Sequence, residues 1–265
     1  MRYILVKYGI MASLIFLASK AEGQRYAQTS EFQLSSPKIS SSTIYFINQT
    51  DIEIDLDIDG VVIHYTTDGS IPTKESDIYK SKISIDQSVQ IKAKAWHEDF
   101  QPSIVVELSV FKLNPNSTIK LEVSPDPSES YPGKGISGLT NQIKGSADFR
   151  DGHWLGFSAD TIEMKVELEK RMDIPKVYLS LLEDQRSWIF VPVSVEAWLG
   201  NEQVTLWEKD RLQNELKSFQ YIQLTIPRKN VKEVTIKIMM NRIPDWHLGT
   251  GSIPWFFVDE VFIQK

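Results

Sequence analysis

The chain has 265 residues, of which 42% are hydrophobic and 24% charged, a composition typical of folded globular protein with room for two domains. Its formal net charge at pH 7 is −6 and its lysines and arginines form no cluster, which argues against nucleic acid or an anionic membrane surface as a partner. The sequence contains no cysteine, which excludes disulfides, thiolate catalysis and a lipid-modified cysteine.

The first residues have the pattern of an export signal. Arg2 and Lys7 supply positive charge, an apolar run follows, and a small-x-small cleavage site ends at Ala21. We therefore expect residues 1–21 to be the cleaved signal peptide of an exported (periplasmic or secreted) protein, and residues 22–33 to be a flexible lead-in. The apolar run is too short to cross a bilayer comfortably, so membrane insertion is not expected.

Residues 34–113 consist of short β patterns separated by turn residues, and they predict a first β-sandwich domain. In its clearest strand Ile52, Ile54, Leu56 and Ile58 alternate with acidic residues. Because successive side chains of a strand point to opposite faces, this pattern places the aliphatic groups on one face and the acids on a solvated face.

The same segment offers a second interpretation as a calcium loop. Asp55, Asp57, Asp59 and Gly60 match the opening of an EF-hand. However, Thr66 stands where the bidentate glutamate should be, and no helical pattern flanks the segment. A solvated acidic strand face is therefore the favoured interpretation.

The order of motifs in this domain points to a known family. Residues 65–73 read Tyr-Thr-Thr-Asp-Gly-Ser-Ile-Pro-Thr, and they are followed by Tyr79, by Ile-Lys-Ala-Lys-Ala-Trp at 91–96, and by Pro-Ser at 102–103. Over about residues 36–112 this sequence resembles the chitobiase/β-hexosaminidase C-terminal domain. The resemblance implies a fibronectin-III-like sandwich, and an accessory module of the kind appended to bacterial glycoside hydrolases.

Residues 114–119 have the composition of a linker, and a second domain is expected over 120–265. Its strand patterns are spaced by about 12 to 20 residues, which favours a β-sandwich with long loops. A helical turn is expected only near Asp210 to Ser218. The expected strands are 161–168, 176–182, 193–199, 221–226, 231–239 and 255–263.

Motifs of this second domain also follow a recognisable order. They are Leu-Thr at 139–140, Asp-Gly-x-Trp-x-Gly-Phe at 151–157, Trp-Ile-Phe-Val-Pro at 188–192, Pro-x-Trp-His at 244–247 and Trp-Phe-Phe-Val-Asp-Glu-Val at 255–261. This order resembles the discoidin-like (coagulation factor C-type) galactose-binding-fold module, a jelly-roll sandwich. The two domains in this sequence are similar to the C-terminal tail of bacterial family-20 β-N-acetylhexosaminidases without their catalytic barrel, which needs about 250 residues.

The sequence does not support an enzyme. Asp259 and Glu260 are adjacent in an expected strand, so their carboxylates are predicted to diverge and cannot act as a pair across a cleft. No Gly-x-Ser-x-Gly nucleophile motif is present. The four histidines are too widely spread for a zinc site, and His64 is expected to be a packed strand residue. They are His64, His97, His153 and His247.

Glycan binding is the function that the resemblance implies, because discoidin-like modules bind glycans through loops at one end of the sandwich. Aromatic rings stack on sugar faces there, with polar groups beside them. Trp154 and Trp188 are expected to be core anchors rather than sugar-binding residues. Trp246 lies in a Pro/Gly loop, and the sequence favours neither packing nor sugar binding for it. The candidate carbohydrate-binding residues are Asp245, Trp246, His247, Arg150, Asp151, His153 and Trp154.

The resemblance also implies a structural calcium ion, and no other cofactor is expected. Asn141 stands where the family's loop has an aspartate, and Glu260 stands at the position of its late acid. An asparagine keeps the oxygen ligand but loses the charge, which weakens a site for a hard cation.

Two functions from different classes remain open. The first is an exported, non-catalytic protein that binds hexosamine- or galactose-type glycans or glycoconjugates weakly. The second is a structural or interaction protein that packs on a partner glycoside hydrolase or surface protein without binding sugar. An exposed Trp246 favours the first, and a Trp246 buried against the first domain favours the second.

Overall fold

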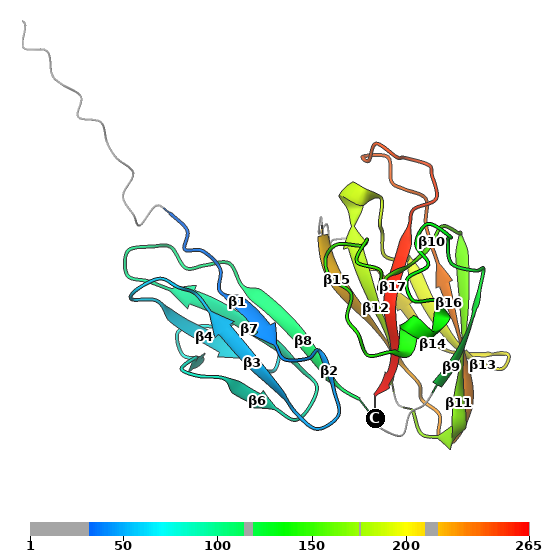
Figure 1. Cartoon of the computed structure of the whole chain (residues 1–265), viewed down its shortest axis with the longest axis horizontal. Helices are drawn as coiled ribbons and strands as arrows, with labels where there is room; N and C mark the ends of the chain where they lie inside the picture. The colour runs from blue at the N-terminus through cyan, green and yellow to red at the C-terminus, as the bar shows by residue number, and fades with distance from the viewer. Residues whose placement is uncertain (1–31, 114–118, 175, 210–216, 265) are drawn as a thin grey trace, which may run out of the picture.

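A computed structural model of the chain describes residues 32–113, 119–174, 176–209 and 217–264, and within them it forms two β-sandwiches that lie side by side (Figure 1). The predicted all-β architecture of two sandwiches is confirmed. The predicted signal peptide and almost all of the predicted lead-in fall outside the described residues.

The first sandwich pairs a three-stranded sheet, in the order β1-β3-β6, with a five-stranded sheet, in the order β2-β8-β7-β4-β5. Most neighbouring strands are antiparallel, but β2 runs parallel to β8. The strands are β1 (Lys38–Ser41), β2 (Tyr45–Phe46), β3 (Thr50–Asp55), β4 (Val62–Thr66), β5 (Asp77–Ile78), β6 (Ile83–Ile85), β7 (Val89–Trp96) and β8 (Val106–Lys112).

Strand β3 shows why this sheet forms. Its residues alternate between buried and exposed, with Ile52 and Ile54 in the core and the acids facing out, as the sequence predicts. The strand ends at Asp55, so Ile58 is not part of it and is 37% exposed. His64 is buried on β4, with its Nδ1 2.8 Å from the carbonyl oxygen of Ser76, which confirms a packed histidine.

The second sandwich pairs a four-stranded sheet, in the order β10-β17-β12-β15, with a five-stranded sheet, in the order β14-β13-β16-β11-β9. Two short 3-10 helices, η2 (Ile136–Thr140) and η3 (Gln185–Ser187), lie in its loops. The strands are β9 (Ile119–Ser124), β10 (Leu155–Phe157), β11 (Thr161–Met172), β12 (Lys176–Asp184), β13 (Ser194–Leu199), β14 (Glu202–Glu208), β15 (Lys217–Thr225), β16 (Val231–Met239) and β17 (Phe256–Gln264).

All six strands expected in this domain are present, with ends that shift by a few residues. Three strands were not predicted: the edge strands β9 and β14, whose half-exposed patterns carry little apolar signal, and β10, which is only three residues long. Ile119 opens β9 rather than closing a linker. In the segment expected to be helical, residues 210–216 lie outside the described part, and Lys217 and Ser218 belong to β15.

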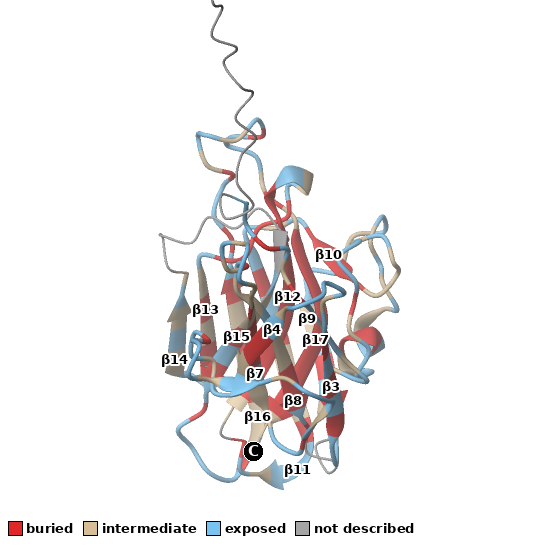
Figure 2. Cartoon of the chain, turned by 90° about the vertical axis from the view of Figure 1, so that its left-hand side faces the viewer, coloured by how far each residue is buried: buried red, intermediate tan, exposed pale blue. Residues whose placement is uncertain are grey.

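A core of aliphatic and aromatic side chains fills the space between the two sheets of the second sandwich. Buried residues run the length of β12 and β17 in Figure 2. Both strands lie inside the four-stranded sheet, so their near-continuous apolar sequences are explained by burial on both faces. The inner face packs on the five-stranded sheet, and part of the outer face packs on the first sandwich.

The two sandwiches contact one another through an aromatic cluster. Phe111 of β8 lies 4.6 Å from the ring of Tyr221 and 5.0 Å from that of Phe262, measured between centroids. Tyr45 of β2 is 5.1 Å from Phe262, and Tyr178 of β12 is stacked on Phe262 at 4.9 Å. These rings are buried or half-buried, so the modules are joined by an apolar interface and not only by the connecting segment.

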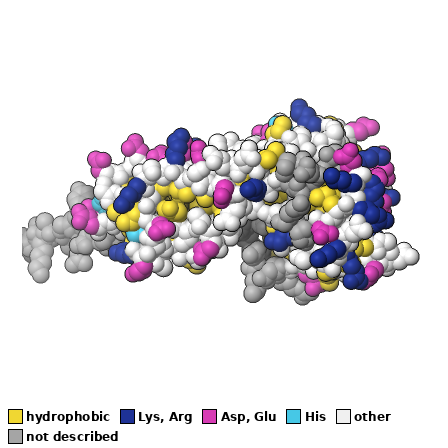
Figure 3. Space-filling view, turned by 90° about the horizontal axis from the view of Figure 1, so that it is seen from below, with side chains coloured by type: hydrophobic (Ala, Val, Ile, Leu, Met, Phe, Trp, Pro, Cys, Tyr) yellow, Lys and Arg dark blue, Asp and Glu magenta, His cyan; other side chains and the backbone are white. Residues whose placement is uncertain are grey.

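The surface is mixed in charge. Basic and acidic side chains intermingle on the second sandwich in Figure 3, and ion pairs such as Lys165–Glu233 and Lys232–Glu167 join β11 to β16. In the part of the chain that the structure describes, no helix has the length and apolar character needed to span a bilayer.

Candidate functional site

The loop between β16 and β17 projects from one end of the second sandwich, at the orange-red tip in Figure 1. Two backbone bonds close its base, from the Ile243 N–H to the Ser252 carbonyl (3.0 Å) and from the Gly251 N–H to the Ile243 carbonyl (2.9 Å). Gly251 has φ of +78°, a left-handed conformation that glycine adopts without strain. Proline and glycine therefore hold the tip, residues 244–250, in a defined shape.

His247 fixes this tip to the body of the sandwich. Its Nδ1 accepts a bond from the Gly249 N–H (3.1 Å), so its Nε2 carries the proton and donates to the Gln185 carbonyl (2.8 Å). Both ring nitrogens are thus used within the protein. His247 is therefore a positioning residue for the loop.

Trp246 is the most exposed indole of the site, with 61% of its surface open to solvent. Its ring lies 5.5 Å from the ring of His247 and 6.5 Å from that of Phe190, which is buried beneath it. The neighbouring Leu248 is fully exposed. A rigid indole on an aromatic base, open to water, is suited to stacking on the apolar face of a ligand.

Trp188 contributes to the same surface, although the sequence predicts a core anchor at this position. It is 41% exposed, has φ of +65°, and its ring lies 6.0 Å from that of His247. Gly249 packs directly under it, because a Cβ at Gly249 would come within 3.1 Å of the indole. The glycine of the loop could have signalled this close approach.

The segment that carries the candidates Arg150, Asp151 and His153 is held mainly by hydrogen bonds among its own residues. The Asp151 carboxylate accepts the backbone N–H groups of Ser146 (2.5 Å) and His153 (2.8 Å). Burial acts to raise the pKa of Asp151, but these hydrogen bonds hold it below its ordinary value. Arg150 is exposed and lies over the ring of Phe149 at 4.8 Å. Carbohydrate binding by Arg150 and by the partly buried Asp151 and His153 stays a prediction.

The indole ring of Trp154 is not exposed to solvent. It is 1% exposed, its Nε1–H donates to the Ser146 carbonyl at 2.9 Å, and Gly145 packs against the indole. The candidate role of Trp154 in carbohydrate binding is therefore wrong, and the residue is the core anchor that the sequence favours.

The two acids of β17 are brought together, contrary to the prediction that they diverge. Ser180 pairs with Glu260 but Leu181 pairs with Val258, so Asp259 is the extra residue of a β-bulge. Both carboxylates are buried, and both bond the same loop. Asp259 binds Lys144 Nζ at 2.9 Å, and Glu260 accepts the Gln142 N–H at 3.0 Å.

The predicted calcium ligands fit a hard cation poorly in this arrangement. The side-chain oxygen of the exposed Asn141 accepts the Ile143 N–H at 2.8 Å, within its own turn. Burial, and then the neighbouring Asp259, raise the pKa of Glu260 to about 8, and the Lys144 ammonium already lies beside Asp259. Among the described residues, no group of three or more histidines and acids could hold a metal ion. The calcium site stays a prediction.

Comparison with known proteins finds a similarity over much of the first sandwich. Residues 42–107 match the family model of the chitobiase/beta-hexosaminidase C-terminal domain. This confirms the resemblance drawn from the motifs at 65–73 and 91–96. No curated protein matches the chain significantly.

Several solved structures share features with the chain at low identity. The CBM32-1, CBM32-2 and M60 catalytic domains of Clostridium perfringens ZmpB match at 11% identity and TM-score 0.36, over 58% of this chain and only 15% of that one. The lectin domain of lectinolysin complexed with Lewis B antigen matches at 13% identity and TM-score 0.36, over 58% of this chain and 98% of that one. The SusE-like protein BT2857 matches at 10% identity and TM-score 0.36, over 85% of this chain and 95% of that one.

Proposed function

We propose that this chain is an exported, non-catalytic accessory protein that binds carbohydrate through the loop at 244–250 of the second sandwich. The observation that carries the proposal is Trp246, a 61% exposed indole supported from below by Phe190 and His247. Such a ring stacks on the apolar face of a pyranose, and the neighbouring Asp245 is placed to accept bonds from hydroxyl groups.

The family resemblance supports the choice of ligand class. The first sandwich matches a domain named for chitobiase and β-hexosaminidase. Hexosamine- or galactose-type glycans are accordingly the ligands to test first. Binding by one exposed ring is expected to be weak, because a single loop buries little of a sugar.

The test is binding of a glycan array and titration calorimetry with the Trp246→Ala variant. The loop base and the His247–Gln185 bond do not involve the indole, so the variant keeps its fold. Affinity for the best glycan should fall about tenfold or more, the loss expected on truncating an aromatic anchor worth about 1.4 kcal/mol. Trp246→Phe should retain part of the affinity, because it keeps an aromatic face.

Leu206→Ala on β14 is the matched control, since Leu206 is a 50% exposed apolar residue of the same module outside this loop. If the Trp246→Ala variant bound glycan with wild-type affinity, the loop at 244–250 would not be the binding site. Absence of binding by the wild-type protein would instead favour the second function, in which the apolar tip with Leu248 packs on a partner protein such as a glycoside hydrolase.

A further inference from the structure

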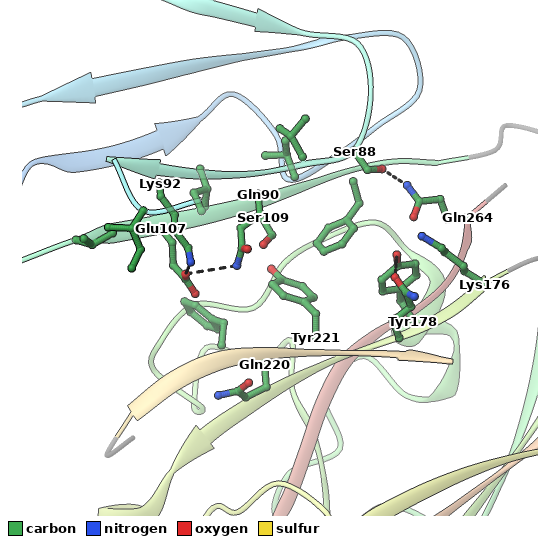
Figure 4. A pocket seen from close by; sticks show the side chains of 18 residues that line it. Ser88, Gln90, Lys92, Glu107, Ser109, Lys176, Tyr178, Gln220, Tyr221 and Gln264 are labelled. Atoms are coloured by element: carbon green, nitrogen blue, oxygen red, sulfur yellow. Dashed lines mark hydrogen bonds and ion pairs between the residues drawn. The ribbon is translucent and has the colours of Figure 1, made fainter. Parts of the chain in front are cut away.

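A cleft of about 1110 Å³ lies between the two sandwiches. Its walls are the outward faces of β7 and β8 on one side and of β12, β15 and β17 on the other (Figure 4). The Trp246 loop does not contribute to its lining. The cleft is therefore a separate place on the molecule from the site of the proposed function.

Neutral hydrogen-bonding groups dominate its polar lining. The glutamines are Gln90, Gln220, Gln223 and Gln264, and the hydroxyl groups are those of Ser88, Ser109, Tyr178 and Tyr221. An amide side chain has two donors and an acceptor with two lone pairs, so one internal bond leaves capacity for a ligand. Gln223, for example, accepts the Tyr178 hydroxyl at 2.6 Å through its Oε1 and keeps its amino group for donation.

The charged groups of the lining partly neutralise one another. Lys92 Nζ lies 3.7 Å from the Glu107 carboxylate, and the other charged residue in the lining is Lys176. An array of this kind has no strong field of either sign. It suits an uncharged ligand rich in hydroxyl groups better than an anion or a highly charged peptide.

An aromatic platform lies among these amides. One side of the Phe219 ring faces the Lys144 ammonium, 4.3 Å from the centroid, and the ring is parallel to that of Trp154 at 6.3 Å. The ring is nevertheless 42% exposed and lines the cleft. Phe219 is thus held in place from within the second sandwich and open on its other side, which is the geometry for stacking on a sugar.

We infer that this inter-module cleft binds a neutral oligosaccharide several sugar units long. Its volume exceeds the range of about 300–1,000 Å³ that holds a drug-sized ligand, so a single sugar would leave most of it filled with water. Strand β12 is paired with β15 on one edge and with β17 on the other, so this part of the lining offers side chains rather than the free main-chain groups that an extended peptide needs.

The decisive experiment is calorimetric titration of the full chain with neutral disaccharides and hexasaccharides of the cello-, xylo-, manno- and chito- series. At least one hexasaccharide should bind more tightly than its disaccharide. Ser109→Trp on β8 fills the cleft without removing a packed side chain, and it should weaken the hexasaccharide about tenfold or more. Phe219→Ala should weaken it in the same direction.

Ser84→Trp is the matched control, because Ser84 is an exposed serine on β6 of the same module outside the cleft, and it should bind like wild type. The Trp246→Ala variant should still bind the hexasaccharide more tightly than the disaccharide, which separates this inference from the proposed function. Hexasaccharide affinity that is unchanged in Ser109→Trp, or lost entirely in Trp246→Ala, would overturn the inference. So would the absence of binding by every hexasaccharide, or an affinity that falls steeply between about 50 and about 500 mM NaCl.

Discussion

Replacing Lys144 with methionine should destabilise the second sandwich by about 3–5 kcal/mol, the usual cost of removing one partner from a buried ion pair. Asp259 is fully buried, and its Oδ2 accepts bonds from Lys144 Nζ at 2.9 Å and from the Gly145 N–H at 2.6 Å. Burial lowers the pKa of Lys144 and raises that of Asp259, and their pairing opposes both changes. Without the lysine, the carboxylate would be left without a cation in a buried site.

Methionine is chosen because it nearly conserves volume. The Lys144 ammonium lies over the rings of Trp154 (4.4 Å) and Phe219 (4.3 Å), and a thioether side chain also packs well against aromatic rings. The measurement is urea unfolding followed by tryptophan fluorescence, which reports mainly on the second sandwich because six of the seven tryptophans follow residue 150. The loss in unfolding free energy should be smaller at acid pH, because protonation of Asp259 removes the unpaired charge.

Lys120→Met supplies the matched control. Lys120 pairs with Glu122 at 3.2 Å on the surface, with 70% and 62% of the two side chains exposed. Exposed pairs contribute about 0–1 kcal/mol, so this variant should unfold almost like wild type. Equal losses in the two lysine variants would mean that the buried pair has no special role in the fold.

The sequence predicts best what depends on local pattern. Alternation at Ile52 and Ile54 defines β3, and the apolar run from Phe256 to Ile263 defines a strand buried on both faces. The loop between β16 and β17 follows from its prolines and glycines. Each of these features is determined by neighbours in the chain.

What the sequence does not predict depends on residues far apart in the chain. The divergence expected for Asp259 and Glu260 assumed a regular strand, but the bulge is visible only in the pairing of β17 with β12. Trp188 is exposed where a core anchor was expected, and its ring lies over Gly249, a residue far along the chain. The inter-module cleft requires contacts such as Phe111 with Tyr221, which no local pattern encodes.

Glu260 should make the protein less stable as the pH rises, and Glu260→Gln should remove that dependence. Its pKa is raised to about 8 in the folded state, first by burial and then by Asp259, against an ordinary value of 4.5. Between these values the folded state holds a proton that the unfolded state has lost. Stability therefore falls as the pH rises from about 4.5 to about 8, and it changes no further through this group above that range.

Glutamine mimics the protonated carboxyl group, and its oxygen can still accept the Gln142 N–H that Glu260 accepts now. In the presence of a chelator, the variant should gain about 1–3 kcal/mol over wild type at pH 8 and almost nothing at pH 5. Urea unfolding at both pH values measures the difference, and Glu163→Gln, at an exposed position of β11, should show none. If the gain at pH 8 is absent, burial does not control this carboxyl group. If calcium instead stabilises wild type but not the variant, an ionised Glu260 ligates the metal, and the loop at 141–145 must open to admit it.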